Sequence, residues 1–273
     1  ARLRAGGADA RLLVGDSPEE TRRHAAAAVA EGVDALVVVG GDGTLSLILD
    51  EVVGTDVPIA LVPAGTGNDL ARSLGLPHGS AERAASAADL ALRSRTRAID
   101  VAEAECGGLR RRFLTVAALG FDAKVSERTN RLRWPRGGAR YYLALVIELI
   151  RLRPAPFSLR IDAGSARPAT GILVAVANTR SYGGGIPICP EADPADGLLD
   201  VTHVRPIGRA RLIRLFPMLL RARHAERPEV VQYRGSTIEV SAPGSAAVVD
   251  GERIGEGSVR FRVLPGALRV FAP

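Results

Sequence analysis

Cysteine is scarce in this chain, which has only Cys106 and Cys189 among its 273 residues. They lie far apart, with no CxxC pair and no histidine cluster nearby, so a disulfide or a zinc site is not expected. The four histidines have no metal-ligand spacing, which argues against a histidine metal centre or a Ser-His hydrolase. No apolar run reaches the roughly 18 to 20 uncharged residues of a membrane-spanning helix, and no signal peptide opens the chain. We therefore expect a soluble, cytoplasmic protein.

Lysine and aromatic residues are also rare. Lys124 is the only lysine, aromatic residues make up 4%, and the net charge of +6 comes almost wholly from arginine. Such a surface favours anionic partners, whether nucleotides, nucleic acids or acidic lipid headgroups. A second interpretation is that the arginine excess reflects genomic base composition and serves only solubility. Because aromatic residues are few, the arginines are scattered and no nucleic-acid-binding module is found, we expect no nucleic-acid partner.

The pattern of the chain changes near residue 98, which predicts two domains. In residues 1–98, β-branched apolar runs at 35–39 and 58–62 alternate with helical patterns, as in a Rossmann-like α/β domain with a mostly parallel sheet. In residues 99–273, short alternating segments broken by glycines predict an antiparallel β-sandwich domain. The predicted helices are 17–32, 45–53, 68–74, 81–93, 141–152 and 209–221. The predicted sandwich strands are 98–105, 112–117, 157–161, 170–177, 198–204, 237–240, 246–249, 259–263 and 268–271.

Two glycine-rich segments follow the two predicted parallel strands. The first glycine segment is residues 40–44 and the second is residues 63–69. Because parallel strands end at the same edge of a sheet, both segments open there, where free backbone N–H groups can bind phosphates. Neither has the dinucleotide fingerprint or the GK[ST] ending of a P-loop. Each also has a structural interpretation, the first as a tight turn that needs glycine and the second as a helix N-cap at Asn68 or Asp69.

Two acidic turns lie in the second half of the chain. Residues 193–197 read DPADG, and on their own they indicate a surface turn, since Asp, Pro and Gly dominate turns. Residues 250–252, here called the acidic turn, follow a short apolar run. On their own they indicate a hairpin turn with solvated acids.

Together these segments resemble the diacylglycerol kinase catalytic family, particularly the soluble bacterial lipid kinases, with NAD kinases and phosphofructokinases as more distant relatives. The resemblance covers essentially the whole chain, through landmarks at 40–44, 63–69, 196–201 and 250–252. It implies an ATP site in a cleft between the α/β domain and the sandwich. The residues that would hold the phosphates are Gly40, Gly41, Asp42, Gly43, Thr44, Thr66, Gly67 and Asn68.

The resemblance also implies a magnesium site in the second domain. Asp196 would offer its carboxylate, and Asp193 and Leu198 would offer main-chain carbonyls. Oxygen ligands of this kind suit Mg²⁺. In the family this ion is linked through water to acids that match Asp69 and Asp100.

A kinase that acts on an alcohol needs a carboxylate near the acceptor hydroxyl to take its proton. We expect Glu252 to be this base, Asp250 to support it and Asp42 to face the phosphates and their metal, although the three roles could be exchanged. The expected reaction moves the γ-phosphoryl group of ATP to the hydroxyl of diacylglycerol and gives phosphatidic acid. The alternatives are another lipid alcohol such as a sphingoid base, a ceramide or a glycolipid, an NAD kinase, and a nucleotide-binding regulator that has lost catalysis.

The chain departs from the family pattern in two places. It starts at Ala1 in what reads as the middle of a domain, so the family's first strand and Asn-Pro nucleotide loop are expected upstream. Ser46 stands where the family often has an asparagine.

Two basic segments are candidates for contact with a membrane. Residues 209–224 mix arginines with large apolar residues, as interfacial helices do, and residues 128–142 contain Trp134. The alternatives are an ordinary helix packed on the sandwich and a flexible loop. We expect a lipid substrate at the membrane surface, contact with anionic phospholipid, peripheral association with the inner face of the membrane and, by analogy with the family, a homodimer.

Overall fold

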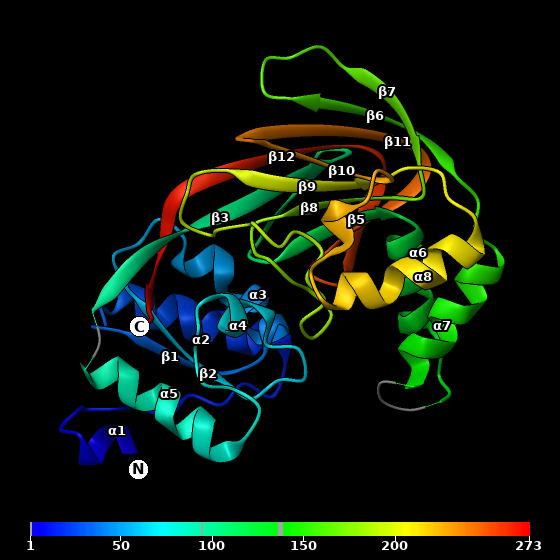
Figure 1. The fold of residues 1–273 in the computed structure, drawn as a ribbon. Coiled ribbons are helices and arrows are strands. Elements are labelled where there is room, and N and C mark those ends of the chain that lie inside the picture. Colours follow the sequence, from blue (N-terminus) through cyan, green and yellow to red (C-terminus); the bar gives the residue numbers. More distant parts are fainter. Residues whose placement is uncertain (1, 94, 136–138) are drawn as a thin grey trace.

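The structure is a computed structural model that describes residues 2–93, 95–135 and 139–273. Figure 1 shows an α/β unit at the lower left and a sandwich of strands above it, with helices α6, α7 and α8 along one side. Among the described residues, no helix has both the length and the apolar character needed to cross a membrane.

The α/β unit is built around two parallel strands, β1 (Leu36–Gly40) and β2 (Ile59–Pro63), in which Gly40 lies opposite Pro63. The predicted common edge for the two glycine segments is therefore confirmed. Helix α2 begins where the sequence predicts, because the Ser17 hydroxyl accepts a hydrogen bond from the backbone N–H of Glu20 at 3.1 Å. The helices of this unit are α1 (Arg2–Ala5), α2 (Pro18–Ala30), α3 (Asp42–Val52), α4 (Asp69–Ser73) and α5 (Ala81–Arg93).

The rest of the chain forms a β-sandwich with helices at one side, and the predicted fold class is confirmed. Its strands are β3 (Thr96–Cys106), β4 (Leu109–Phe113), β5 (Val116–Gly120), β6 (Ala155–Ile161), β7 (Arg167–Gly171), β8 (Leu173–Ala177), β9 (Leu199–Val204), β10 (Val230–Gly235), β11 (Thr237–Val249) and β12 (Glu252–Phe271). Its helices are α6 (Phe121–Arg131), α7 (Ala139–Ile150), α8 (Arg209–Leu220) and the 3₁₀ turn η1 (His224–Glu226).

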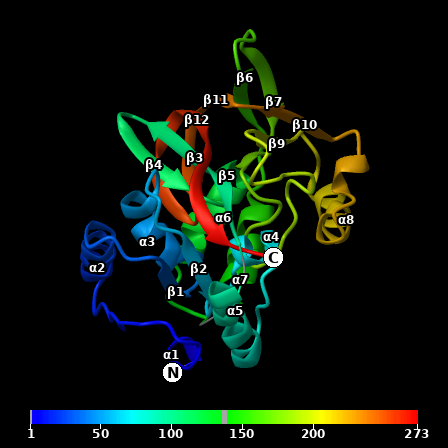
Figure 2. The same ribbon diagram turned by 90° about the vertical axis from the view of Figure 1, so that its left-hand side faces the viewer.

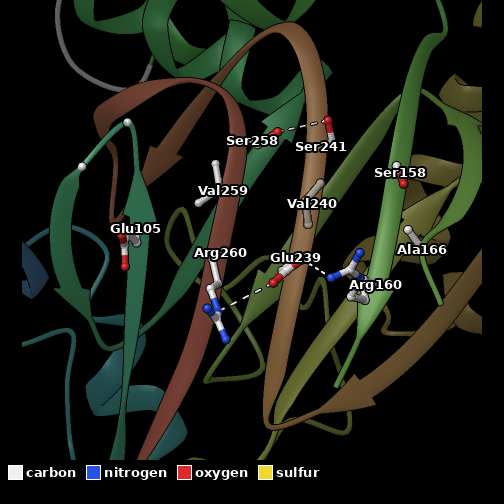
Figure 3. A pocket seen from close by; sticks show the side chains of 12 residues that line it. Glu105, Ser158, Arg160, Ala166, Glu239, Val240, Ser241, Ser258, Val259 and Arg260 are labelled. Atoms are coloured by element: carbon white, nitrogen blue, oxygen red, sulfur yellow. Dashed lines mark hydrogen bonds and ion pairs between the residues drawn. The ribbon is translucent and has the colours of Figure 1, made fainter. Parts of the chain in front are cut away.

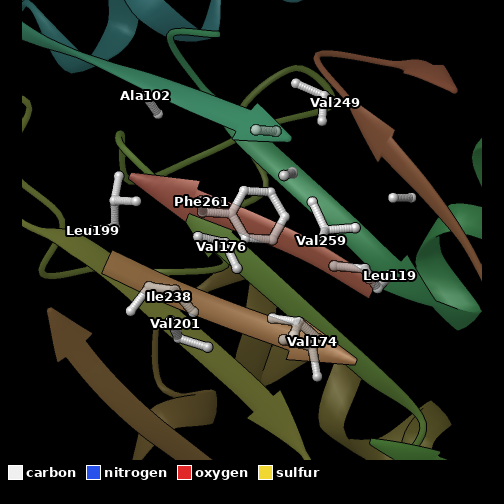
Figure 4. Packing of buried hydrophobic residues seen from close by; sticks show 14 of the residues in the cluster. Ala102, Leu119, Val174, Val176, Leu199, Val201, Ile238, Val249, Val259 and Phe261 are labelled. Carbon is white, nitrogen blue, oxygen red and sulfur yellow. The ribbon is translucent and has the colours of Figure 1, made fainter. Parts of the chain in front are cut away.

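Strand β11 passes from one layer of the sandwich to the other. Residues 238–241 pair with β6, and after an irregularity between Ala242 and Ala246, residues 247–249 pair with β5. The core lies between the layers, and Phe261 is among its buried side chains (Figure 4). Phe261 meets Phe113 edge to face with ring centroids 6.2 Å apart. Each fully buried side chain of this size contributes roughly 1.5 to 3 kcal/mol to the free energy of unfolding.

The two domains share strands β3 and β12, which run side by side toward the α/β unit (Figure 2). The end of β12 pairs parallel to β2, with Val270 opposite Ile59. Leu268 and Val270 are therefore part of the same buried cluster as the helices of the first unit. The acids of the second domain are thus held in a fixed relation to the glycine segments of the first.

Several predicted boundaries are wrong. Two predicted strands are each divided in the structure: 112–117 between β4 and β5, and 170–177 between β7 and β8. Conversely, two pairs of predicted strands are each continuous: 237–240 and 246–249 in β11, and 259–263 and 268–271 in β12. Helix α6 and strand β10 were not predicted, and α3 begins at Asp42 rather than at Leu45. The last difference matters for function, because Asp42, Gly43 and Thr44 form the first turn of a helix.

Candidate active site

The two glycine segments touch each other backbone to backbone. A Cβ atom built on Gly65 would lie 2.5 Å from the Cα of Gly41, so a side chain there would force the segments apart. The backbone N–H of Ala64 donates to the carbonyl of Gly40 at 2.9 Å. Because α3 starts at Asp42, the first backbone N–H groups of this helix are free for an anion.

Asp42 and Asn68 tie the second segment to the first. The carboxylate of Asp42 accepts hydrogen bonds from the backbone N–H groups of Asp69 at 3.0 Å and Leu70 at 3.1 Å. Asn68 has a positive φ of 54°, and its side-chain amide bonds the backbone of Gly65 at both its oxygen and its nitrogen. Asn68 is thus the N-cap residue of α4, one of the two predicted, but its side chain makes no capping hydrogen bond, and Asp42 caps the helix from a different segment. The phosphate contacts of these residues stay a prediction.

A third glycine segment, residues 183–185, joins this group from the second domain. The buried carboxylate of Asp69 accepts hydrogen bonds from the backbone N–H groups of Gly184 at 2.8 Å and Gly185 at 2.7 Å, and from the hydroxyl of Ser181 at 3.0 Å. All three glycines have positive φ, which other residues rarely adopt. The sequence analysis missed this segment, although three consecutive glycines were a usable signal.

The acidic turn is the hairpin between β11 and β12, with positive φ at Asp250 and Gly251. The carboxylate of Asp250 accepts hydrogen bonds from the backbone N–H of Leu114 at 3.3 Å and from both the backbone N–H, at 3.2 Å, and the hydroxyl of Thr115. Burial raises the pKa of Asp250 to about 6, these hydrogen bonds oppose the rise, and the negative charge of Asp42 adds to it. The structure therefore brings Asp250 close enough to Asp42 for their charges to interact.

Glu252 is the more exposed of the two acids in the acidic turn, and its carboxylate pairs with Arg111 of β4 at 2.8 Å. The same guanidinium donates to the hydroxyl of Ser46 at 3.4 Å. Ser46 is on α3, two residues after Thr44. The contacts of Arg111 with Glu252 and with Ser46 thus connect the predicted base with the helix that follows the first glycine segment. Arg111 was not predicted, because one arginine of an RRR run has no local feature to mark it.

The predicted magnesium loop (residues 193–198) is anchored by Asp100 at the junction of the two domains. The buried carboxylate of Asp100 accepts hydrogen bonds from the backbone N–H groups of Gly197 at 2.7 Å and Gly266 at 2.8 Å. Its own backbone N–H donates to the carbonyl of Pro194 at 2.6 Å. Asp100 therefore joins this loop to the bend in β12.

Within the loop, Asp196 is the carboxylate that the predicted magnesium ion needs. One of its oxygens accepts from the backbone N–H of Leu198 at 3.0 Å, and the other lies 3.4 Å from the guanidinium of Arg234. The carboxylate of Asp193 accepts a hydrogen bond from the backbone N–H of Ala195 at 3.1 Å. Across the described parts of the chain, no three His, Cys, Asp or Glu side chains are grouped to hold a metal. A single paired carboxylate and two neutral carbonyls fit only a weakly held, mostly hydrated ion, and the magnesium site stays a prediction.

A cavity of about 390 Å³ lies on the outer face of β3, β6, β11 and β12 (Figure 3). Its Glu239 pairs with Arg160 at 3.2 Å and with Arg260 at 3.7 Å. None of the predicted site residues lines this cavity. Since its charged side chains largely neutralise one another, it is not part of the candidate site.

The fold and the site define a class of two-domain proteins in which an α/β unit with glycine segments meets acids from a β-sandwich. Residues 1–104 match the family model of the diacylglycerol kinase catalytic domain, and residues 115–272 match that of the YegS C-terminal NAD kinase beta sandwich-like domain. The chain is 43% identical over 274 residues to a diacylglycerol kinase of Mycobacterium tuberculosis, with 100% of this chain and 88% of that protein covered. It is 34% identical over 260 residues to a probable lipid kinase YegS-like of Pseudomonas aeruginosa, with 93% and 82% covered. The chain therefore belongs to the diacylglycerol kinase and YegS-like family of lipid kinases, and the resemblance predicted from the sequence is confirmed.

Two solved structures have the same fold as this chain. A putative diacylglycerol kinase from Bacillus anthracis has a TM-score of 0.80 at 23% identity, with 100% of this chain and 87% of that chain covered. An NAD kinase from Archaeoglobus fulgidus in complex with ATP has a TM-score of 0.55 at 18% identity, with 99% and 86% covered. At these identities the likeness shows the fold alone.

Proposed function

We propose that this protein transfers the γ-phosphoryl group of ATP to the hydroxyl of diacylglycerol and releases phosphatidic acid and ADP. The observation that carries the proposal is the pair of contacts made by the guanidinium of Arg111. It lies 2.8 Å from the carboxylate of Glu252 in the acidic turn and 3.4 Å from the hydroxyl of Ser46 on the helix after the first glycine segment. This pair of contacts supports a reaction between a group bound at the glycine segments and a hydroxyl beside Glu252.

In the proposed reaction, the lipid hydroxyl oxygen attacks the γ-phosphorus. The new oxygen–phosphorus bond forms as the bond to the β–γ bridging oxygen breaks, and the hydroxyl proton passes to the carboxylate of Glu252. The free backbone N–H groups of Gly43 and Thr44 in the first turn of α3 are donors for the phosphate oxygens. Asp250, held by Leu114 and Thr115, keeps the acidic turn in place.

Magnesium, when bound, would neutralise charge on the phosphates or hold the loop of residues 193–198. Asp196 would hold it in the loop, with the carbonyls of Asp193 and Leu198. Because Asp196 already faces Arg234, we assign no catalytic step to this loop.

Diacylglycerol is favoured over other lipid alcohols because the relative at 43% identity is named a diacylglycerol kinase, whereas relatives near 34% are named only as YegS-like lipid kinases. An NAD kinase is less well supported, since the sequence relatives are lipid kinases and only the fold is shared with NAD kinases. The proposed place of action is the cytoplasmic face of a membrane, where ATP and the lipid are both available. A homodimer remains an expectation from the family.

The two membrane-contact candidates from the sequence differ in their packing. In α8, which covers most of 209–224, Leu212, Leu215 and Leu219 pack against a buried cluster of the sandwich, although Ile213 remains 57% exposed. That arrangement is the ordinary packed helix. The other candidate, residues 128–142, spans the end of α6 and the start of α7, and its residues 136–138 lie outside the described residues. Membrane contact by either segment stays a prediction.

The test incubates the protein with γ-labelled ATP, Mg²⁺ and mixed micelles that contain diacylglycerol, sphingosine, ceramide or a glycolipid, with NAD in a parallel reaction. Label in phosphatidic acid supports the proposal. Label only in another lipid phosphate would change the acceptor, and label only in NADP would replace the lipid kinase by an NAD kinase. Nucleotide binding without any labelled product would favour the regulator that has lost catalysis.

A further inference from the structure

Asn178 directly follows β8 and is completely buried. Its side-chain nitrogen donates hydrogen bonds to the backbone carbonyls of Asp100 at 3.0 Å and Leu114 at 3.2 Å. Its backbone N–H donates to the carbonyl of Thr115 at 2.9 Å. Because both acceptors of the side chain are carbonyl oxygens, only the NH₂ group of the amide can face them, and this fixes the orientation of the side chain. Asn178 therefore connects two segments that are distant in sequence.

The first of these segments is the gap between β4 and β5, formed by Leu114 and Thr115. Their backbone N–H groups both donate to the carboxylate of Asp250, at 3.3 and 3.2 Å. Their carbonyls both accept hydrogen bonds from Asn178. Asn178 thus holds this gap through its carbonyls, and the gap holds the acidic turn through its N–H groups.

The peptide bond between Leu114 and Thr115 has a hydrogen bond at each end. Its carbonyl accepts from the side chain of Asn178, and its N–H donates to Asp250. Hydrogen bonds in such a chain polarise one another, so the amide of Asn178 makes the N–H of Thr115 a better donor to the carboxylate. Hydrogen bonds to the charged form of an acid favour that form. Asn178 therefore supports the ionised state of Asp250, which burial opposes.

The second segment is the part of β3 that carries Asp100. The carboxylate of Asp100 accepts hydrogen bonds from Gly197 in the predicted magnesium loop and from Gly266 in β12. Strand β3 is also one of the two strands that the domains share. The amide of Asn178 thus joins the gap that holds Asp250 to the strand at the domain junction.

We propose that Asn178 is a positioning residue for phosphoryl transfer. It fixes the gap at residues 114–115 and so keeps Asp250, together with the proposed base Glu252, at the place from which the lipid hydroxyl attacks. The inference rests on the proposed kinase function. Because Asn178 has no exposed surface, it does not touch a substrate and acts only through Asp250.

The first test measures hydrogen–deuterium exchange without any substrate. Asn178→Leu keeps the branched shape of the side chain but removes both of its donors. Thr202→Val is the matched control, because it removes a buried hydroxyl of the same sandwich that donates to the carbonyl of Ile188 at 2.8 Å. In Asn178→Leu the N–H groups of residues 114 and 115 should exchange roughly tenfold faster, since lost hydrogen bonds make local opening easier. Thr202→Val should leave exchange at these two groups unchanged.

The second test measures kinetics with ATP and diacylglycerol in mixed micelles. Asn178→Leu should lower kcat roughly tenfold, because misplaced reacting groups are costly, and change the KM for ATP by less than about twofold. Thr202→Val should lower Tm but keep kcat. In a protein that already carries Asp250→Asn, Asn178→Leu should lower kcat by a further factor of less than about three, since its effect passes through Asp250.

A third variant, Asn178→Ser, keeps one donor in a smaller side chain. Its kcat should lie between those of the wild type and Asn178→Leu. If Asn178→Leu does not fold, Asn178→Ser takes its place in both tests, with effects in the same direction.

Unchanged exchange at residues 114 and 115, or wild-type kcat in Asn178→Leu, would overturn the proposal. An equal loss of kcat in Thr202→Val, or the same effect of Asn178→Leu with and without Asp250→Asn, would also overturn it, because Asn178 would then contribute only to general stability. The exchange measurement needs no catalysis. Faster exchange in Asn178→Leu, in a protein whose wild type phosphorylates no acceptor, would refute the kinase function and leave Asn178 as the residue that holds the acidic turn.

Discussion

The guanidinium of Arg111 lies 2.8 Å from the carboxylate of Glu252 and also reaches Ser46 on α3. A residue that holds the proposed base against the α/β unit should affect turnover more than substrate binding. We expect Arg111→Gln to lower kcat roughly tenfold, since small misplacements of reacting groups are costly, while the KM for ATP changes little. Steady-state kinetics with diacylglycerol in mixed micelles measures both constants.

The matched control is Arg110→Gln, on the same strand, because Arg110 pairs with Glu105 at 3.3 Å. Exposed ion pairs contribute about 0.2 to 1 kcal/mol to stability, so neither variant should unfold. Equal kcat values for the two variants would remove Arg111 from the positioning role.

Asp69 holds the third glycine segment with three hydrogen bonds, from Gly184, Gly185 and Ser181. Asp69→Ala leaves these donors, of which Ser181 is buried, without their acceptor, and the free energy of unfolding should fall by about 3 kcal/mol. Urea denaturation followed by circular dichroism measures this change. Asp50→Ala, which removes one exposed partner of Arg112, should change it by less than about 1 kcal/mol. A similar small change for Asp69→Ala would show that its hydrogen bonds do not hold the two domains together.

The raised pKa of Asp250 makes stability depend on pH. The folded state keeps this proton up to about pH 6, whereas the unfolded state releases it near the ordinary value of 3.8. The folded state therefore binds more protons between these values, and the contribution of Asp250 to stability falls as pH rises from about 4 to 6. Acidification from pH 6.5 to 4.5 should thus raise the free energy of unfolding of the wild type by roughly 1 to 2 kcal/mol more than that of Asp250→Asn.

Other acids also bear on this pH experiment. Burial also raises the pKa of Asp122 to about 6, against the hydrogen bond from Tyr182, so Asp250→Asn should remove only part of the dependence. Hydrogen bonds from Thr237 and Ser236 lower the pKa of Asp162, which stays ionised over this range, and Asp162→Asn should leave the dependence unchanged. The same pH dependence in wild type and Asp250→Asn would contradict the raised pKa.

Arg234 competes with any cation at Asp196, since it lies 3.4 Å from that carboxylate and also forms two hydrogen bonds to Asp200. If the loop of residues 193–198 binds Mg²⁺, millimolar Mg²⁺ without nucleotide should raise Tm by a few degrees. Asp196→Ala should abolish that rise and Arg234→Gln should enlarge it, as differential scanning fluorimetry would detect. A rise that survives Asp196→Ala would place the ion elsewhere.

Local sequence was enough to predict the parallel strands and the edge on which their glycine segments open. Strands β1 and β2 are short apolar runs that contain β-branched residues and end in glycine or proline. This pattern is typical of buried strands and can be recognised from local sequence alone. Helix α6 was missed because Phe121–Arg131 is mostly polar and has few apolar residues to mark a helical period. The break in the predicted strand 112–117 has a long-range cause, since the backbone N–H groups of Leu114 and Thr115 bind Asp250 rather than a neighbouring strand.

The candidate site was predictable where the family pattern names a residue and unpredictable where only the fold brings residues together. Asp42, Asp69, Asp100 and Asp250, all named from the family pattern, each accept hydrogen bonds from segments distant in sequence. Their partners could not be found in advance. Arg111 reaches Glu252 across 141 positions of sequence, a separation that no local pattern encodes.

The most direct test of the proposed chemistry compares Glu252→Gln with Glu256→Gln, a change at an exposed glutamate on the same strand that pairs with Arg253. Loss of a general base costs about 10² to 10⁴ in rate, so Glu252→Gln should lower kcat for diacylglycerol phosphorylation at least 100-fold with ATP affinity nearly unchanged. Glu256→Gln should keep close to the wild-type rate. Wild-type turnover in Glu252→Gln would contradict the assignment of the acidic turn as the place where the lipid hydroxyl loses its proton.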